Sequence, residues 1–295
     1  METLTEVVGR VFSPQVLILG FLISSLYALV AVGFTMIFGV AGVLNLAHGA
    51  FVMVGAYLAI WAFVILKWSL PVAFAFAILG VAVIAPLVYR VLIRPIENRT
   101  VTVFLATLLL AVLLEQVIIL FFSAKPRTDL PPFIQGGFVL WGTSIPYNRL
   151  LAGVVALVVI GLLWAFVTRT KTGKAILALS MDRRGAALVG IASHRITLWV
   201  WAISGALAAI AGLFITSFLG IQPFEERVSL VIAFSTVVLG GLGSIPGSLW
   251  AAFIIGYAET IAQAFAPEAR GLASLVILLI VLTIRPQGLF GRAAT

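Results

Sequence analysis

The sequence contains no cysteine, only two histidines and few charged residues. Without cysteine the chain can form no disulfide, thiol nucleophile or cysteine-ligated metal centre. Neither histidine belongs to a His/Glu/Asp cluster with metal-ligand spacing, so we expect no metal site. No Ser/His/Asp arrangement or carboxylate pair stands out as catalytic either. We therefore expect a protein that is not an enzyme and has no cofactor of its own.

Charged residues make up 9% of the chain, compared with about 25% in ordinary soluble domains, and 63% of residues are hydrophobic. A soluble fold cannot bury that much apolar surface, so lipid must solvate part of it. The net charge is +8, but the cations gather at the ends of apolar runs, which is typical of membrane topology and not of nucleic-acid binding. The start, Met1–Arg10, carries Glu2 and Glu6 and does not resemble a cleavable signal peptide.

A helix needs about 20 apolar residues to cross the roughly 30 Å hydrocarbon core of a membrane. One run, Val228–Leu239, is shorter than this and is either a short, broken crossing or a re-entrant segment. We predict a single all-α polytopic membrane domain over residues 1–295, with about eight transmembrane helices, or nine if the short run crosses. The other predicted spans are Pro14–Phe38, Leu44–Leu66, Leu70–Ile93, Val101–Phe122, Arg149–Val167, Ile196–Leu219, Ile245–Phe265 and Gly271–Ile284.

An excess of lysine and arginine marks the cytoplasmic side of a membrane protein. This rule places Arg90–Arg99, the segment 168–195 and the basic end from Arg285 to Arg292 in the cytoplasm. The connections that contain Glu225–Arg227 and Glu259–Arg270 lack the excess and are expected outside. An odd number of crossings must then lie between Arg227, expected outside, and Arg285, expected in the cytoplasm. The N-terminus is expected outside.

The segment 168–195 is a basic loop in which only Asp182 opposes the cations. Within it, Thr172–Ala175 resembles the end of a phosphate-binding loop. Thr168 stands where that motif needs glycine, however, and Ala175 stands where it needs serine or threonine. The chain is therefore not expected to bind and hydrolyse ATP by that chemistry.

Residues 182–191 of the loop are predicted to form a short helix that Asp182 caps. Its small apolar side chains fit the groove of a soluble partner, and its arginines equally fit lipid headgroups. The candidates for contact with a partner are Asp182, Arg183, Arg184, Ala186, Ala187 and Gly190.

Two glycine-rich segments, Gly39–Gly49 and Gly240–Gly247, interrupt apolar runs in a similar way and suggest a duplicated unit. Such breaks expose backbone polar groups, which a membrane tolerates only inside protein or along a wet cavity. They are interpreted either as close helix packing with a turn or as parts of a translocation path. The candidate path or hinge residues in them are Gly39, Gly42, Asn45, His48, Gly49, Gly240, Gly243, Ser244 and Gly247.

Glu115 lies in the predicted span Val101–Phe122, where an ionised carboxylate is costly unless it is paired or hydrated. It is a candidate path or gate residue, and the alternative is a helix–helix contact or a protonated side chain. A carboxyl that titrates or binds a cation would instead fit an ion-coupled secondary transporter. A passive channel is the third class that the sequence leaves open.

Several segments, in this order along nearly the whole chain, resemble the permeases of branched-chain amino acid ABC importers. They are Leu26–Gly39, Val43–Phe51, Lys171–Ala175, Asp182–Ile191 and Val238–Ser248. The resemblance implies a permease subunit of the bacterial inner membrane that works by alternating access. It also implies a second, related permease, two ATPase subunits that bind ATP, a periplasmic binding protein and membrane lipid as partners.

The resemblance further implies that the segment 168–195 is a cytoplasmic coupling loop in which Asp182–Ile191 contacts the ATPase. Family members commonly carry Glu-Ala-Ala-x-x-x-Gly there, whereas this chain has Arg184 and Gly185 in place of Glu and the first Ala. Branched-chain or other amino acids are the implied cargo. Urea and short amides, which related permeases carry, are the alternative.

Overall fold

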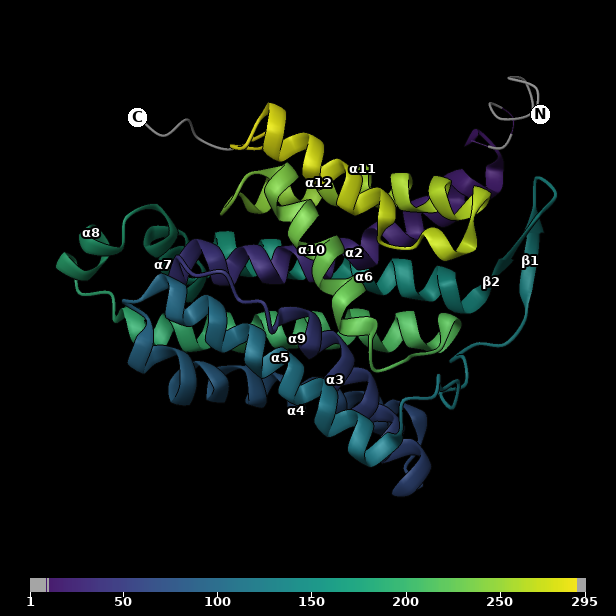
Figure 1. Cartoon of the computed structure of the whole chain (residues 1–295), viewed down its shortest axis with the longest axis horizontal. Coiled ribbons are helices and arrows are strands. Elements are labelled where there is room, and N and C mark those ends of the chain that lie inside the picture. Colours follow the sequence, from purple (N-terminus) through teal and green to yellow (C-terminus); the bar gives the residue numbers. More distant parts are fainter. Residues whose placement is uncertain (1–8, 10, 291–295) are drawn as a thin grey trace.

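The computed structural model describes residue 9 and residues 11–290 of the chain. Its long helices run roughly along one direction, and a small β-hairpin stands at one end of them (Figure 1). We call this the hairpin end, and we call the opposite end, which carries α7 (Lys171–Met181) and α8 (Arg183–Leu188), the loop end. Arg292, Glu2 and Glu6, which supported the predicted orientation and the absence of a signal peptide, lie outside the described residues.

Seven of the described helices are long and apolar enough to cross a membrane, and α12 is a shorter apolar helix. The prediction of an all-α polytopic membrane protein with about eight spans is therefore confirmed. The seven long helices span Pro14–Ala41, His48–Ile65, Leu70–Ile96, Thr100–Phe122, Tyr147–Arg169, Ser193–Ser217 and Ile245–Phe265.

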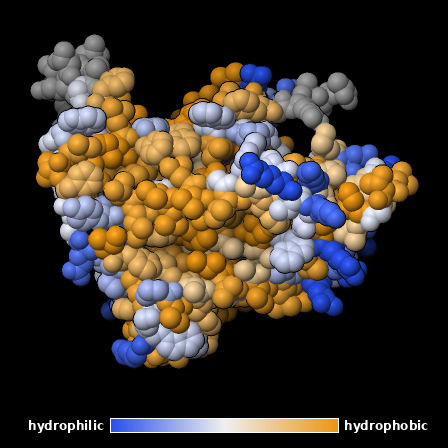
Figure 2. Space-filling model, turned by 180° about the vertical axis from the view of Figure 1, so that it is seen from behind, coloured by the Kyte–Doolittle hydropathy of each residue, from blue (hydrophilic) through white to orange (hydrophobic). Residues whose placement is uncertain are grey.

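Three helices form the centre of the bundle: α2 (Pro14–Ala41), α3 (His48–Ile60, continued by a π-helical turn) and α9 (Ser193–Leu219). In their most apolar windows 72%, 72% and 67% of residues are buried, against 33% or less in α4, α5 and α6. Helices this apolar can leave so much surface exposed only if lipid or another protein covers it. Figure 2 shows hydrophobic side chains over the middle of one face and hydrophilic ones mainly toward its edges.

The outer layer consists of α4 (Leu70–Val88), α5 (Thr100–Phe122) and α6 (Tyr147–Arg169). Pro86 lies inside α4, where it removes a backbone donor and disturbs the preceding turn. A π-helical turn, Tyr89–Ile93, follows at once, and both proline and π-helical turns are places where helices kink.

The chain ends in α10 (Glu225–Gly240), α11 (Ile245–Phe265) and α12 (Leu272–Ile284). A Cβ on Gly271, just before α12, would lie 3.5 Å from Val228 near the start of α10, and Leu289 N donates to Leu239 O at 2.7 Å. Thus α10 and α12 run in the same direction, and α11 returns between them. Since α10 has only 16 residues and is not among the seven long helices, the predicted odd number of crossings stays a prediction.

The hairpin pairs β1 (Gly137–Leu140) with β2 (Thr143–Pro146) in antiparallel register. Its two-residue turn, Trp141-Gly142, has positive φ at both positions, as a type I′ turn requires. Ile145 of β2 is buried against the start of α2. No strand was predicted here from the sequence, because four-residue strands give too weak an alternation to detect.

Candidate functional site

Asp182 caps α8 at the loop end, as predicted: its Oδ1 accepts a hydrogen bond from Arg184 N at 2.9 Å. Ala186 is buried against the protein, whereas Ala187 is exposed. The large apolar side chains at the end of the helix are the most exposed, with Leu188 at 89% and Val189 at 77%. The short helix therefore places its apolar tip, and not Ala186, on the outside.

Gly190 ends this segment with φ +83°, a conformation that favours glycine. The departure at Gly185 also has a structural consequence. A Cβ at that position would lie 2.5 Å from Oδ2 of Asp182, so alanine there would disturb the cap. The glycine in place of the family's alanine thus suits this chain's own cap.

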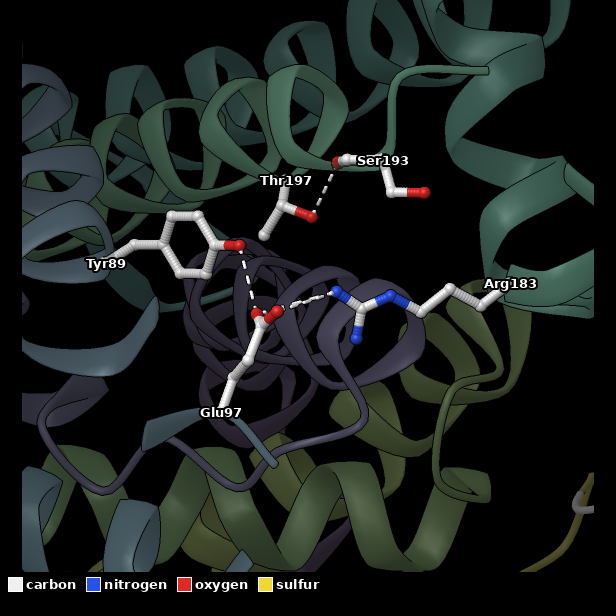
Figure 3. A network of polar contacts seen from close by, with 5 residues as sticks. All are labelled: Tyr89, Glu97, Arg183, Ser193 and Thr197. Carbon is white, nitrogen blue, oxygen red and sulfur yellow. Dashed lines mark hydrogen bonds and ion pairs between the residues drawn. The ribbon is translucent and has the colours of Figure 1, made fainter. Parts of the chain in front are cut away.

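Arg183 points toward Glu97, which follows the end of α4 (Figure 3). Its Nη2 lies 3.5 Å from Oε1 of Glu97, and the hydroxyl of Tyr89 donates to Oε2 of the same carboxylate at 3.1 Å. The two basic segments predicted on one side of the membrane, Arg90–Arg99 and 168–195, therefore meet at the loop end. Sequence reasoning did not select Glu97, because its only signal is a lone acid within a basic segment.

Aromatic contacts continue inward from Tyr89 toward the first glycine break. Its ring stacks on Trp201 of α9 at 5.6 Å between centroids, and Trp201 meets Phe51 of α3 edge-on at 6.4 Å. Phe51 lies 6.2 Å from His48, which lies 5.5 Å from Phe34 of α2. A contiguous set of large rings thus joins the α8 contact to residues at the start of α3.

The first break is a non-helical segment between α2 and α3, closed at its start by Gly42 with φ +68°. Asn45 accepts a hydrogen bond from Ala47 N at 3.1 Å, and Leu46 N donates to Thr107 of α5 at 3.2 Å. These bonds satisfy backbone groups that lie outside any helix. They also explain why α3 begins at His48 and not at Leu44, where the predicted span began.

His48 and Gly49 place the start of α3 against two other helices. The His48 ring bonds the carbonyl of Val30 in α2 through Nε2 at 3.0 Å. A Cβ on Gly49 would overlap the backbone oxygen of Glu226 at the start of α10. His48 is thus held by protein, and Gly49 permits the close approach of α3 and α10.

The second break joins α10 to α11, where Ser244 caps α11 by accepting from Gly247 N at 3.1 Å. Gly240 and Gly247 lie in such close contact that a Cβ on the first would lie 2.5 Å from the second's carbonyl carbon. A Cβ on Gly39 would lie 3.6 Å from Gly243 O, so the two breaks meet. A small cavity among α2, α7 and α11 adjoins this meeting point.

Glu115 of α5 pairs with Arg227 of α10. Arg227 Nη2 lies 3.0 Å from both carboxylate oxygens, and Nε lies 3.3 Å from Oε2. The assignment of Glu225–Arg227 to a connection between spans is wrong, because these residues form the first turn of α10. Sequence reasoning missed the pair, since only the tertiary fold brings α5 and α10 together.

Glu259 was assigned to an external connection, although it falls within the predicted span Ile245–Phe265; it lies inside α11 and is 0% exposed. Its carboxylate accepts hydrogen bonds from Gly271 N at 2.8 Å, Ser274 N at 2.8 Å and the Ser274 hydroxyl at 2.6 Å. Glu225 pairs with Arg270 nearby. These acids hold the start of α12 in place.

A bundle of long apolar helices, broken at two glycine-rich segments, defines a class of protein: a polytopic integral membrane protein. The chain belongs to the family described as "Branched-chain amino acid transport system / permease component", which it matches over residues 16–284. It is therefore a permease subunit of an ABC importer, multi-pass in the inner membrane and without a catalytic domain. Membership implies ATPase, second permease and binding-protein partners.

Relatives cover nearly the whole chain. It is 32% identical to the high-affinity branched-chain amino acid transport system permease protein BraD of Pseudomonas aeruginosa, over 94% of this chain and 95% of the relative. It is 29% identical to LivH of Escherichia coli, over 92% and 94%. The ribose import permease protein RbsC of Haemophilus influenzae is 27% identical, over 79% and 73%.

A likeness among solved structures concerns the fold alone. PsaBC from Streptococcus pneumoniae in complex with Fab has a TM-score of 0.55 and 14% identity, covering 97% of each chain. Family membership decides the class that the sequence left open, because an ABC permease draws on ATP hydrolysis by its partners and is neither an ion-coupled transporter nor a passive channel.

Proposed function

We propose that this chain pairs with a second, related permease to carry a branched-chain amino acid across the inner membrane. A periplasmic binding protein delivers the cargo at the hairpin end. Two ATPase subunits dock at the loop end, which faces the cytoplasm because its basic segments follow the positive-inside rule. The names of BraD and LivH support this cargo, and the ribose permease and short amides mark the alternatives.

The observation that carries the docking proposal is the apolar tip of α8. Leu188 and Val189 are 89% and 77% exposed beside the charged side chains of Arg183 and Arg184. At an end of the molecule that meets water, such an exposed apolar tip favours a protein partner that buries it.

The movement of the docked ATPases at α8 must then be transmitted to the transport path. The contacts Arg183–Glu97–Tyr89 and the ring series from Tyr89 through Trp201 to His48 support a mechanical connection between them. Alternating access needs a bias of about 5.5 kcal/mol to switch the population almost completely, which nucleotide binding by the partners can supply. In this proposal, the glycine breaks permit that movement, since Gly39 and Gly243 meet there without side chains between them.

Replacing Leu188 with glutamate is expected to abolish recovery of the ATPase subunits with the purified permease. The substitution puts a charge where an apolar side chain becomes buried, which costs several kcal/mol on binding. Co-purification of the ATPases and ATP hydrolysis per permease are the measurements. Val139→Glu is the control, because Val139 is 70% exposed at the hairpin end and should leave recovery unchanged.

Leu188→Glu is preferable to a substitution of Gly190, whose positive φ would add backbone strain to any loss of contact. Full recovery of the ATPases with Leu188→Glu would overturn the assignment of α8 as the docking helix.

Replacing Glu97 with glutamine is expected to preserve docking but to lower the amount of cargo moved per ATP hydrolysed, by about two- to fivefold. The reason is that the substitution removes the charge that Arg183 contacts, while a partly exposed ion pair contributes less than about 1 kcal/mol to stability. Asp129→Asn breaks a comparable pair with Arg127 at the hairpin end and should leave this ratio unchanged. An unchanged ratio for Glu97→Gln would remove the contact from the coupling route.

A further inference from the structure

The ion pair with Glu115 does not by itself explain why the side chain of Arg227 is exposed. Its side chain is 64% exposed, whereas that of its partner Glu115 is 1% exposed. Glu115 lies seven residues before the end of α5 at Phe122, which is about 10 Å along the helix. A cation exposed at this depth does not face hydrocarbon; it faces a watery path or another protein chain.

The guanidinium of Arg227 is held along one edge only. Its hydrogen bonds to described residues use Nε and Nη2, both to Glu115, and the guanidinium carbon lies 5.4 Å from the centre of the Phe224 ring. A guanidinium offers five N–H donors in a planar fork that matches a carboxylate. The edge that includes Nη1 therefore remains available to a second carboxylate, with the orientation of the fork already fixed.

A second acid lies beside this pair. Glu226 is 5% exposed, and its Oε2 has no hydrogen-bond partner among the described residues. Its carboxyl is close enough to Glu115 and Arg227 to interact with both electrostatically. One guanidinium thus faces two carboxyl groups, and a buried carboxyl oxygen without a donor indicates that a further donor or cation belongs at this place.

We propose that Arg227 and Glu226 form a binding site for a zwitterionic α-amino acid on the translocation path. The carboxylate of the cargo binds the free edge of Arg227, and the unpartnered Oε2 of Glu226 accepts a hydrogen bond from its ammonium group. Glu115 acts as a positioning residue that aims the guanidinium. This inference rests on the proposed function, and it extends that proposal by assigning the cargo's two charged groups to named residues at the α5–α10 face.

The site also gives a reason for specificity. A sugar or a neutral amide has no carboxylate for Arg227, so binding it would leave the guanidinium edge without an acceptor. The aliphatic side chain of the cargo needs no polar group from this site. Charge recognition at Arg227 would therefore select the backbone of an amino acid and not the length of its side chain.

The test uses the complete importer in proteoliposomes, with both permeases, the ATPases and binding protein loaded with leucine. Arg227→Lys keeps the charge and its attraction to Glu115 but loses the fork. We expect leucine uptake to fall about tenfold or more, while the ATPase subunits are still recovered with the permease. Arg127→Lys is the matched control, because Arg127 also pairs with an acid and lies 5.4 Å over an aromatic ring, that of Phe122.

An exchange of charges separates binding from structure. If Arg227 serves only to pair with Glu115, Arg227→Glu combined with Glu115→Arg should restore uptake. If Arg227 binds the cargo, the exchange leaves an acid at the exposed position, and uptake should stay low. Recovery in the exchanged protein, or normal uptake with Arg227→Lys, would overturn the proposal. Should the exchanged chain fail to assemble, Arg227→Lys alone decides. Failure of the wild-type chain to recover ATPases would instead count against the proposed function.

Discussion

Replacing Glu259 with leucine is expected to prevent the chain from accumulating as a folded protein in the membrane. The Glu259 carboxylate is fully buried and accepts from two backbone N–H groups and one hydroxyl at the start of α12. Leucine has a similar volume but accepts nothing, so all three donors would be left buried without a partner. At about 1–3 kcal/mol for each unsatisfied group, the loss is at least about 3 kcal/mol. That is a large part of a typical total stability of about 5–15 kcal/mol.

We expect the loss of folded structure to be local at first. The start of α12 would part from α11, and the connection 266–271 would become open to protease. The measurements are the amount of permease recovered from membranes and its midpoint of thermal unfolding in detergent. Glu268→Leu is the control, since Glu268 is exposed in the same connection and should change neither. An unfolding midpoint of Glu259→Leu equal to that of the control would show that α12 is held by its apolar side chains alone.

The error in the sequence analysis at Glu259 has a physical origin. A carboxylate near the end of an apolar run is most simply interpreted as the beginning of a water-facing connection. The four N–H groups at the start of every helix need acceptors, however, and α12 begins directly after a tight turn at Gly271. Which acid satisfies them depends on the packing of α11 against α12, and no local pattern records that packing.

The spans themselves were predictable because bilayer thickness and backbone hydrogen bonding constrain them directly. The predicted run Ile245–Phe265 has the same bounds as α11, and Asp182 caps α8 as its residue type indicated. Pairings between distant segments were not predictable. Arg227 with Glu115, and Arg183 with Glu97, depend on which helices become neighbours, and one sequence contains no information on covarying positions.

Gly49 illustrates what the sequence could predict and what only the tertiary structure could show. Its place in a glycine-rich break was visible in the sequence, which allowed either close packing or a path. The structure places its Cα against the backbone of Glu226, the residue whose carboxyl belongs to the proposed cargo site. The close packing is confirmed at this position, and the role in a path stays a prediction that rests on the proposed cargo site.

Replacing Gly49 with leucine is therefore expected to remove both folding and transport. A Cβ at this position overlaps Glu226 O and lies 2.9 Å from Cβ and 3.0 Å from N of Leu230. Backbone atoms of a packed helix cannot move aside as a flexible side chain can, so we expect a cost at or above the upper end of overpacking, about 3 kcal/mol. Recovery of folded permease from membranes and leucine uptake are the measurements.

Gly161→Leu makes the same change in a helix where nothing described lies within 4 Å of the new Cβ, on an exposed face of α6. Leucine is the better helix former, so this control should be neutral or slightly stabilising. The contrast between the two variants separates the effect of the α3–α10 contact from the general effect of losing a glycine. If Gly49→Leu folds and transports as well as Gly161→Leu, then α3 and α10 do not meet as closely as the structure places them, and the cargo site loses the wall that the first break provides.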